Sequence, residues 1–204
     1  MHARFVILTA LGLIVAGGLA AQTRVQTETI QPPAAPGAPQ APAVATEPSV
    51  PAEIITDLSR LPVPVARMRQ RILEAARSGD LEKLLLVMQS NETLPVFSFG
   101  DEKDPIAFWR ANFPDSDGVE ILATLIQILE TGFVHVARGT PQDMYVWPYF
   151  AQTPLKDLSR GQKVELFRIV TGSDYKEMAA LGAYSFYRVG IAPDGVWHYF
   201  VAGE

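Results

Sequence analysis

A proline- and alanine-rich segment over residues 22–52 limits where this chain can fold. It reads QTRVQTETIQPPAAPGAPQAPAVATEPSVPA, without the three-to-four-residue apolar spacing of a helix or the alternation of a strand. We therefore expect an extended, partly polyproline linker. The alternative is that these prolines are a ligand for aromatic grooves. A single folded domain is predicted over 53–204, a length that can bury a sizeable core.

Residues 1–21 have the layout of a secretory signal peptide. Arg4 precedes an uncharged apolar run from Phe5 to Ala21, and Gly18-Leu19-Ala20 offers the small-x-small pattern that signal peptidase accepts. The alternative is an uncleaved anchor, because the run is close to the shortest helix that spans a hydrocarbon core of about 30 Å. The sequence thus predicts that the protein is periplasmic or secreted, or that it is anchored in the inner membrane if this segment is retained.

Cysteine is absent from the chain, which excludes disulfides, lipoprotein anchoring, thiolate nucleophiles and cysteine-ligated metal. An exported domain of this kind must be held together by its core. The formal net charge is −5, and it becomes −6 without the leader because Arg4 is the only charge removed. This mild acidity without clusters of Lys and Arg argues against a nucleic-acid partner, and we expect membrane contact only through the N-terminal segment.

Apolar residues spaced three and four apart predict a tight helical hairpin that turns at Gly79, with Asp80 capping its second helix. The two apolar stripes are Val65, Met68, Ile72 and Ala75, then Leu81, Leu84, Leu85 and Met88. Further helices are predicted after Asp104, after Asp117 with Glu120, after Ser159 with Gln162, and from about Asp174 to Leu181.

Short β-branched and aromatic runs separated by turn residues predict strands, and the corner Pro193-Asp194-Gly195 gives the strongest hairpin signal. The runs are Leu94–Phe99, two that begin at Phe133 and Met144, and two that begin at Tyr184 and Val196. The expected fold is therefore α+β, with helical hairpins packed on one mainly antiparallel sheet of about five strands.

The stretch MYVWPYFAQ and the last hairpin supply the candidate binding residues. In a regular strand Tyr145, Trp147 and Tyr149 share one face, and Pro148 belongs at a strand's edge or end. The last strand likewise places Trp197, Tyr199 and Val201 together. If this row of aromatic side chains is exposed, it suits binding of a glycan or an extended peptide. If helices cover it, the same side chains belong to the core. The candidate ligand-binding residues are Tyr145, Trp147, Tyr149, Trp197, Tyr199, His198 and Arg188.

Enzyme signatures are sparse. The chain has no G-x-S-x-G, H-E-x-x-H or phosphate-binding glycine motif. His135 and His198 would form a general base or a pair of metal ligands if they met across the sheet, with Asp143 or Glu165 as a third group. Residues 115–118 resemble part of a calcium loop, but Val119 and Ile126 stand where oxygen ligands are needed. We expect no metal or other cofactor.

Two segments carry a resemblance. The tail YSFYRVGIAPDGVWHYFVAGE, together with YVWPYFA, resembles segments of uncharacterised exported bacterial proteins, over a range from about Leu61 to the end. The segment ILEAARSGDLEKLLLVM is similar to the opening of small α+β domains of the nuclear transport factor 2 type. Neither resemblance implies a catalytic residue.

These observations favour an exported envelope protein that acts as a non-enzymatic binding module, with an envelope protein, a peptide or a glycan as its partner. The alternatives are a periplasmic hydrolase or isomerase with a pocket that contains His135 and His198, and a purely structural spacer.

Overall fold

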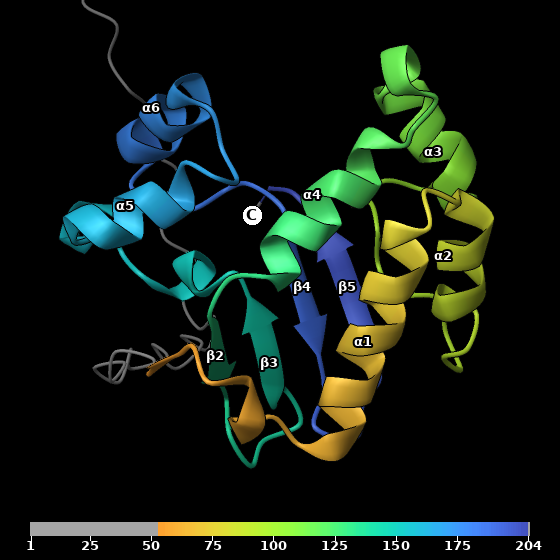
Figure 1. Ribbon diagram of the computed structural model, residues 1–204, viewed down its shortest axis with the longest axis horizontal. Coiled ribbons are helices and arrows are strands. Elements are labelled where there is room, and N and C mark those ends of the chain that lie inside the picture. The colour runs from red at the N-terminus through yellow and green to blue at the C-terminus, as the bar shows by residue number, and fades with distance from the viewer. Residues whose placement is uncertain (1–52, 204) are drawn as a thin grey trace, which may run out of the picture. The chain divides into compact units, whose positions relative to one another are not determined.

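A computed structural model describes residues 53–203 of the chain, so the leader and the linker predicted from the sequence lie outside the described residues. Six α-helices and one antiparallel sheet of five strands confirm the expected α+β fold (Figure 1). No helix in this range has the length and apolar character needed to cross a bilayer.

The sheet follows the order of the sequence, β1-β2-β3-β4-β5, with neighbouring strands antiparallel. Its strands are β1 Ile54–Ile55, β2 Phe133–Val136, β3 Met144–Trp147, β4 Arg188–Ile191 and β5 Trp197–Val201. Pro148 directly follows the last residue of β3, at a strand's end as expected. The outer strand β1 was not predicted, because so short a strand carries no pattern of its own.

Leu94–Phe99 was predicted to be a strand, and this prediction is wrong. Only Val96 pairs, in an isolated parallel bridge to Tyr199, through Val96 N–H to the His198 carbonyl and Phe200 N–H to the Val96 carbonyl, each 2.8 Å. Pro95 has no amide hydrogen to extend this ladder. On the other side the chain turns, with the Gly100 N–H donating to the Ser98 hydroxyl at 2.9 Å.

Four helices lie between β1 and β2 in the chain and pack as one layer: α1 Val63–Arg77, α2 Leu81–Met88, α3 Pro105–Asn112 and α4 Glu120–Leu129. Asp80 and Asp104 cap α2 and α3 with their carboxylates, as predicted. Asp117 does not cap α4. It adopts a left-handed backbone with φ 50°, and the Ser116 hydroxyl instead accepts the Glu120 N–H.

The main core lies between this helical layer and one face of the sheet. Figure 1 shows α1 and α4 in front of β4 and β5. The sheet residues that enter this core are Ile55, Phe133, Tyr145, Trp147, Val189, Ile191, Trp197 and Phe200, and they meet apolar side chains of α1, α2, α3 and α4. Burial of these aromatic rings removes a large apolar area from water, which is the main source of stability in a domain without disulfides.

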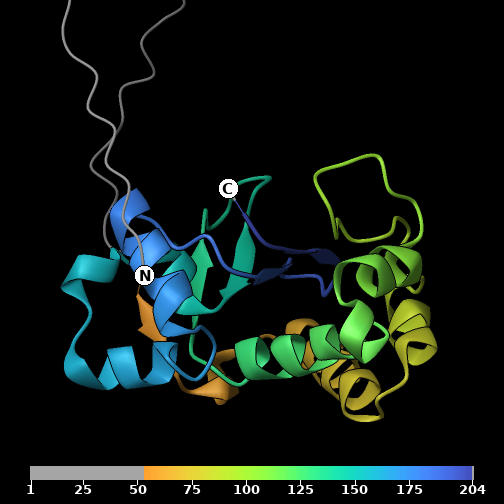
Figure 2. The same cartoon turned by 90° about the horizontal axis from the view of Figure 1, so that it is seen from above.

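A smaller core covers the other face, but only at one end of the sheet. It is built on Val134 and Val146 by α5 Arg160–Leu166 and α6 Gly172–Leu181, whose predicted ends at Ser159 and Gly182 are confirmed. The remaining short elements are 3-10 helices over Leu58–Arg60, Pro114–Ser116, Tyr149–Gln152 and Leu155–Asp157. Figure 2 shows α5 and α6 toward the β2 and β3 end, so they leave the same face of β5 without a helix.

A β-bulge in β5 decides which aromatic residues face this uncovered side. Gly190 pairs with Tyr199 and Ile191 pairs with Trp197, so His198 is an extra residue in the strand. Trp197 therefore turns into the main core with Phe200, while Tyr199 faces the opposite side. The prediction that Trp197 and Tyr199 share a face is wrong for this reason.

The burial of the two tryptophans gives a direct test. Trp147 and Trp197 are both 0% exposed, and replacing either with alanine is expected to lower the free energy of unfolding by about 3–5 kcal/mol. Phe99, which is 64% exposed, is the control, and Phe99→Ala should change stability by less than about 0.5 kcal/mol. Urea unfolding of the three variants measures both. Near-normal stability of the tryptophan variants would place these rings at the surface.

Trp147→Phe is expected to cost less stability than Trp147→Ala, because it keeps an aromatic ring in the core and leaves a smaller cavity. Both substitutions also remove the indole Nε1, a buried donor without a hydrogen-bond partner among residues 53–203, so the loss of this donor does not distinguish them.

Candidate functional site

Four of the seven candidate binding residues lie inside the protein. Trp147 and Trp197 are 0% exposed, Tyr149 is 1% exposed and Tyr145 is 6% exposed. Tyr145, Trp147 and Trp197 belong to the main core under the helices, whereas Tyr149 begins a 3-10 helix after Pro148 and belongs to the smaller core. The expected exposed row of aromatics is therefore not formed by these residues, because helices cover both of the places where they lie.

The other three candidates lie in β4 and β5, away from the main core. Tyr199 and Arg188 are half-buried, and His198 is exposed at the bulge. Tyr199 and Arg188 line a cavity of about 330 Å³ together with Val96, Phe99, Gln152 and Val201. A second cavity, of about 460 Å³, also contains Gln152 and Arg188 in its wall and extends toward Tyr184. The two cavities therefore adjoin at Gln152 and Arg188, and we call them together the Arg188 groove.

The floor of the groove is set by a close approach of Tyr199 to β4. A Cβ atom built on Gly190 would lie 2.3 Å from the Cε1 and Cζ atoms of Tyr199, so the ring occupies the space that any side chain at position 190 would need. Burial raises the pKa of the Tyr199 phenol, and the nearby charge of Arg188 only partly opposes this rise. Tyr199 thus serves as a neutral aromatic surface at physiological pH.

Arg188 is held in place at the centre of the groove. Its Nη2 donates a hydrogen bond to the carbonyl of Gly203, which follows the end of β5. The guanidinium also lowers the pKa of Tyr184, although burial raises that pKa by more, so the cation lies near two phenols. Among residues 53–203 no carboxylate oxygen lies within 4.0 Å of Arg188.

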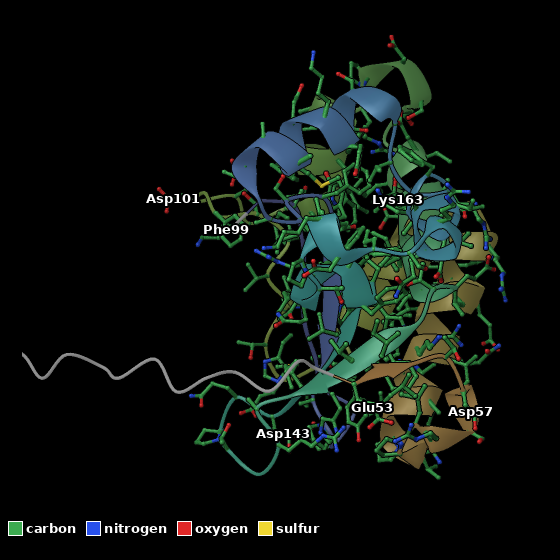
Figure 3. The ribbon with its side chains drawn as sticks, turned by 90° about the vertical axis from the view of Figure 1, so that its left-hand side faces the viewer. Glu53, Asp57, Phe99, Asp101, Asp143 and Lys163 are labelled. Carbon is green, nitrogen blue, oxygen red and sulfur yellow. The ribbon has the colours of Figure 1, made fainter. Side chains whose placement is uncertain are left out.

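Phe99 lines the same groove from a loop that is supported by its own hydrogen bonds. The Ser98 hydroxyl donates to Oε2 of Glu102 at 2.6 Å, and this bond is the main cause of the lowered pKa of Glu102. Figure 3 shows Phe99 and Asp101 projecting on the side of the domain away from α1. Phe99 is 64% exposed and Val96 is 48% exposed, so this wall presents apolar surface to solvent.

Sequence reasoning missed Val96, Phe99 and Gln152 as site residues. The first two belong to a run that was interpreted as a strand, and nothing in the residue pattern indicates that they are exposed. Gln152 follows the aromatic stretch as an ordinary polar residue. The turn residue Gly100, directly after Phe99, is the one sequence feature that could have suggested a loop at this position.

The two histidines are not brought together. His135 lies in β2 and His198 in β5, three strand spacings apart, or roughly 14 Å at about 4.8 Å for each pair of neighbours. The proposed hydrolase or isomerase pocket built on both imidazoles is therefore not formed. No group of three or more His, Cys, Asp or Glu side chains within the described range is arranged to hold a metal ion.

The carboxylates considered as third groups have structural partners instead. Asp143 accepts a hydrogen bond from Nε2 of His135 at 2.6 Å and from the Gly139 N–H at 2.8 Å, which ties the two strands to their connecting turn. The His135 ring also stacks on Tyr145, with ring centroids 4.1 Å apart. Glu165 accepts from the Tyr149 hydroxyl at 2.7 Å and so joins α5 to the smaller core.

Comparison with protein-family models, with curated proteins and with solved structures found no match to this chain. The Arg188 groove is therefore interpreted from its own geometry and chemistry.

The contact between Gly190 and Tyr199 can be tested by a double-mutant cycle. Gly190→Ala is expected to destabilise the protein by about 1–3 kcal/mol because the new methyl group overlaps the Tyr199 ring. In a Tyr199→Ala background the same substitution should cost almost nothing. Urea unfolding of the four proteins measures the coupling. An equal cost in both backgrounds would mean that the ring does not lie on Gly190.

The lowered pKa of Asp143 predicts a pH-dependent contribution to stability. The hydrogen bond from Gly139 is the main cause of this lowering, followed by that from His135, so folding favours the ionised carboxylate. Its contribution is full above the unfolded pKa of about 3.9 and is lost as the pH falls through the lower folded pKa.

Asp143→Asn should therefore be less stable than the natural protein at pH 7, and the difference should disappear in strong acid. Thermal unfolding at a series of pH values measures this. Asp115→Asn is the control, since Asp115 is exposed and forms no ion pair with residues 53–203. A difference between Asp143→Asn and the natural protein that does not change with pH would contradict the assignment.

Proposed function

We propose that this protein is an exported envelope protein that acts as a non-enzymatic binding module and holds its partner in the Arg188 groove. The observation that carries the proposal is the pairing of exposed apolar side chains, Val96 and Phe99, with the half-buried Tyr199 and Arg188 in one cavity. Aromatic and arginine side chains are enriched where proteins bind partners, because each offers a large contact area together with a directed polar group.

Binding is favoured over catalysis by the groups that line the groove. The ionisable side chains among the lining residues are Arg188, Tyr184 and Tyr199, with no imidazole or carboxylate. An arginine does not lose its proton at physiological pH, and burial raises the pKa of both tyrosines. None of the three is therefore suited to accept a proton from a substrate near neutral pH.

Export rests on the N-terminal sequence. An apolar leader followed by a proline-rich linker is the arrangement of a domain held at a distance from a membrane, or released after cleavage. Cell fractionation tests this part of the proposal. Full-length protein in the cytosol with its first residues intact would refute export without bearing on the groove.

Site-specific cross-linking tests the groove itself. A photoreactive benzoylphenylalanine in place of Phe99 is expected to give partner adducts in living cells, whereas the same group in place of Leu86 should give at least about tenfold fewer. The two positions are matched, at 64% and 65% exposed, but Leu86 lies on α2 in the helical layer. Tyr199→Ala, which removes the groove floor, should reduce the Phe99 adducts. Equal yields at both positions, or adducts insensitive to Tyr199→Ala, would count against the groove as the binding site.

A further inference from the structure

Arg188 is the single charged side chain among the residues that line either part of the groove. A guanidinium carries five N–H donors, and the hydrogen bond to the Gly203 carbonyl uses only part of them. Within residues 53–203 the guanidinium of Arg188 forms no other hydrogen bond, and no carboxylate pairs with it. A planar carboxylate matches the two-donor geometry of a guanidinium better than other common groups do.

An apolar wall lies beside this cation. Val96, Phe99, Val201 and Tyr199 line the same cavity as Arg188, and Phe99 and Val96 are the most exposed of them. A ligand that covers them with an apolar or aromatic side chain removes that surface from water, and the Phe99 and Tyr199 rings offer faces for packing.

Gln152 adds a third requirement. This residue lines both cavities, as Arg188 does, and its carboxamide carries a donor and an acceptor, the pair of groups that a peptide unit presents in return. Apart from Gln152 and Arg188 the two cavities are lined by different segments, residues 150–154 and 182–184 in one and the Phe99 loop with β5 in the other, which suits an extended chain. A fatty acid would supply the carboxylate but nothing for Gln152, and a neutral glycan would leave Arg188 without a counter-charge.

Charges beyond Phe99 limit the ligand further. Asp101 and Glu102 follow Phe99 on its loop, and Figure 3 places Asp101 close to it. A second anionic group at that end of the groove would be repelled. The complementary ligand therefore has one carboxylate at the Arg188 end and no negative charge near the Phe99 loop.

We propose that the Arg188 groove binds an extended peptide through a carboxylate placed on Arg188 and a neighbouring apolar or aromatic side chain placed against Phe99 and Tyr199. This inference rests on the proposed binding function and names its ligand class. The carboxylate comes either from the C-terminus of the peptide or from an acidic side chain, and the test separates these sources.

Three synthetic peptides are titrated into the full-length protein by isothermal calorimetry: acetyl-Ala-Ala-Ala-Phe with a free carboxylate, the same peptide as its C-terminal amide, and acetyl-Ala-Ala-Phe-Glu amide. A charge-assisted pair is expected to make at least one carboxylate peptide bind about tenfold or more tightly than the neutral amide. Preference for the first indicates a C-terminal carboxylate, and preference for the third indicates a side-chain carboxylate.

Variants separate the charge from the apolar contact. Arg188→Gln should abolish the preference for the carboxylate peptides, whereas Arg188→Lys should keep part of it. Phe99→Ala should lower the affinity for all three peptides by a similar factor and leave the preference for the carboxylate peptides unchanged. Because Arg188 also supports the chain after β5, the thermal unfolding midpoint of each variant is compared with that of the natural protein. Phe99→Ala tests the apolar contact in a protein that keeps Arg188.

Three outcomes would overturn the inference: equal affinity for acid and amide, a preference that survives Arg188→Gln, or no binding of any peptide. If cross-linking from position 99 persists in any of these cases, the proposed binding function stands and the ligand has a different chemistry. A variant lacking Glu204 is included because this residue directly follows Gly203. If only that variant prefers the carboxylate peptides, the natural occupant of Arg188 is the chain's own end, and the inference fails.

Discussion

The burial of one aromatic sheet face under α1 and α4 is the interaction on which the rest of this structure depends. Phe133, Trp147, Trp197 and Phe200 are each 0% exposed and form the sheet side of the main core. With no cysteine in the chain, no disulfide can compensate for a loss of this packing. The same burial removes the largest aromatic side chains from the surface, so any binding surface must be built from what remains on the other face. The helical layer therefore both stabilises the domain and determines which residues are available for function.

A single extra residue in β5 then shapes the available face. The bulge at His198 allows Trp197 and Phe200, which are three positions apart, to enter the same core, and it turns Tyr199 outward over Gly190. Without the bulge one of these large rings would have to leave its side of the sheet, because side chains alternate strictly along a regular strand. Glycine at position 190 is required by this arrangement, since the ring of Tyr199 fills the space beside its Cα. The groove is thus a consequence of how the core is packed.

Most of the chemically versatile groups are engaged in holding the domain together. His135 and Asp143 bond to each other and to the turn that connects β2 to β3, and Glu165 bonds to Tyr149. These groups are partly buried and paired, which favours a structural role for them. Arg188 differs, because its guanidinium forms only one hydrogen bond within residues 53–203, which leaves other donors free, and the residue lines a cavity. This contrast underlies our proposal that the protein binds a partner and does not transform a substrate.

The sequence by itself determined the α+β class, the helical hairpin that turns at Gly79, the caps at Asp80, Asp104 and Ser159, and the corner at Pro193-Asp194-Gly195. These features depend on residues within about four positions of each other, so local patterns suffice to predict them. Only the tertiary structure decided the pairing of Ile54 with Val134, the failure of Leu94–Phe99 to form a strand, and the exposure of Phe99 beside the burial of Trp147. Each of these depends on which distant segment packs against the residue. Alternation along a strand assigns side chains to two faces but does not say which face helices will cover, and one bulge reverses the assignment.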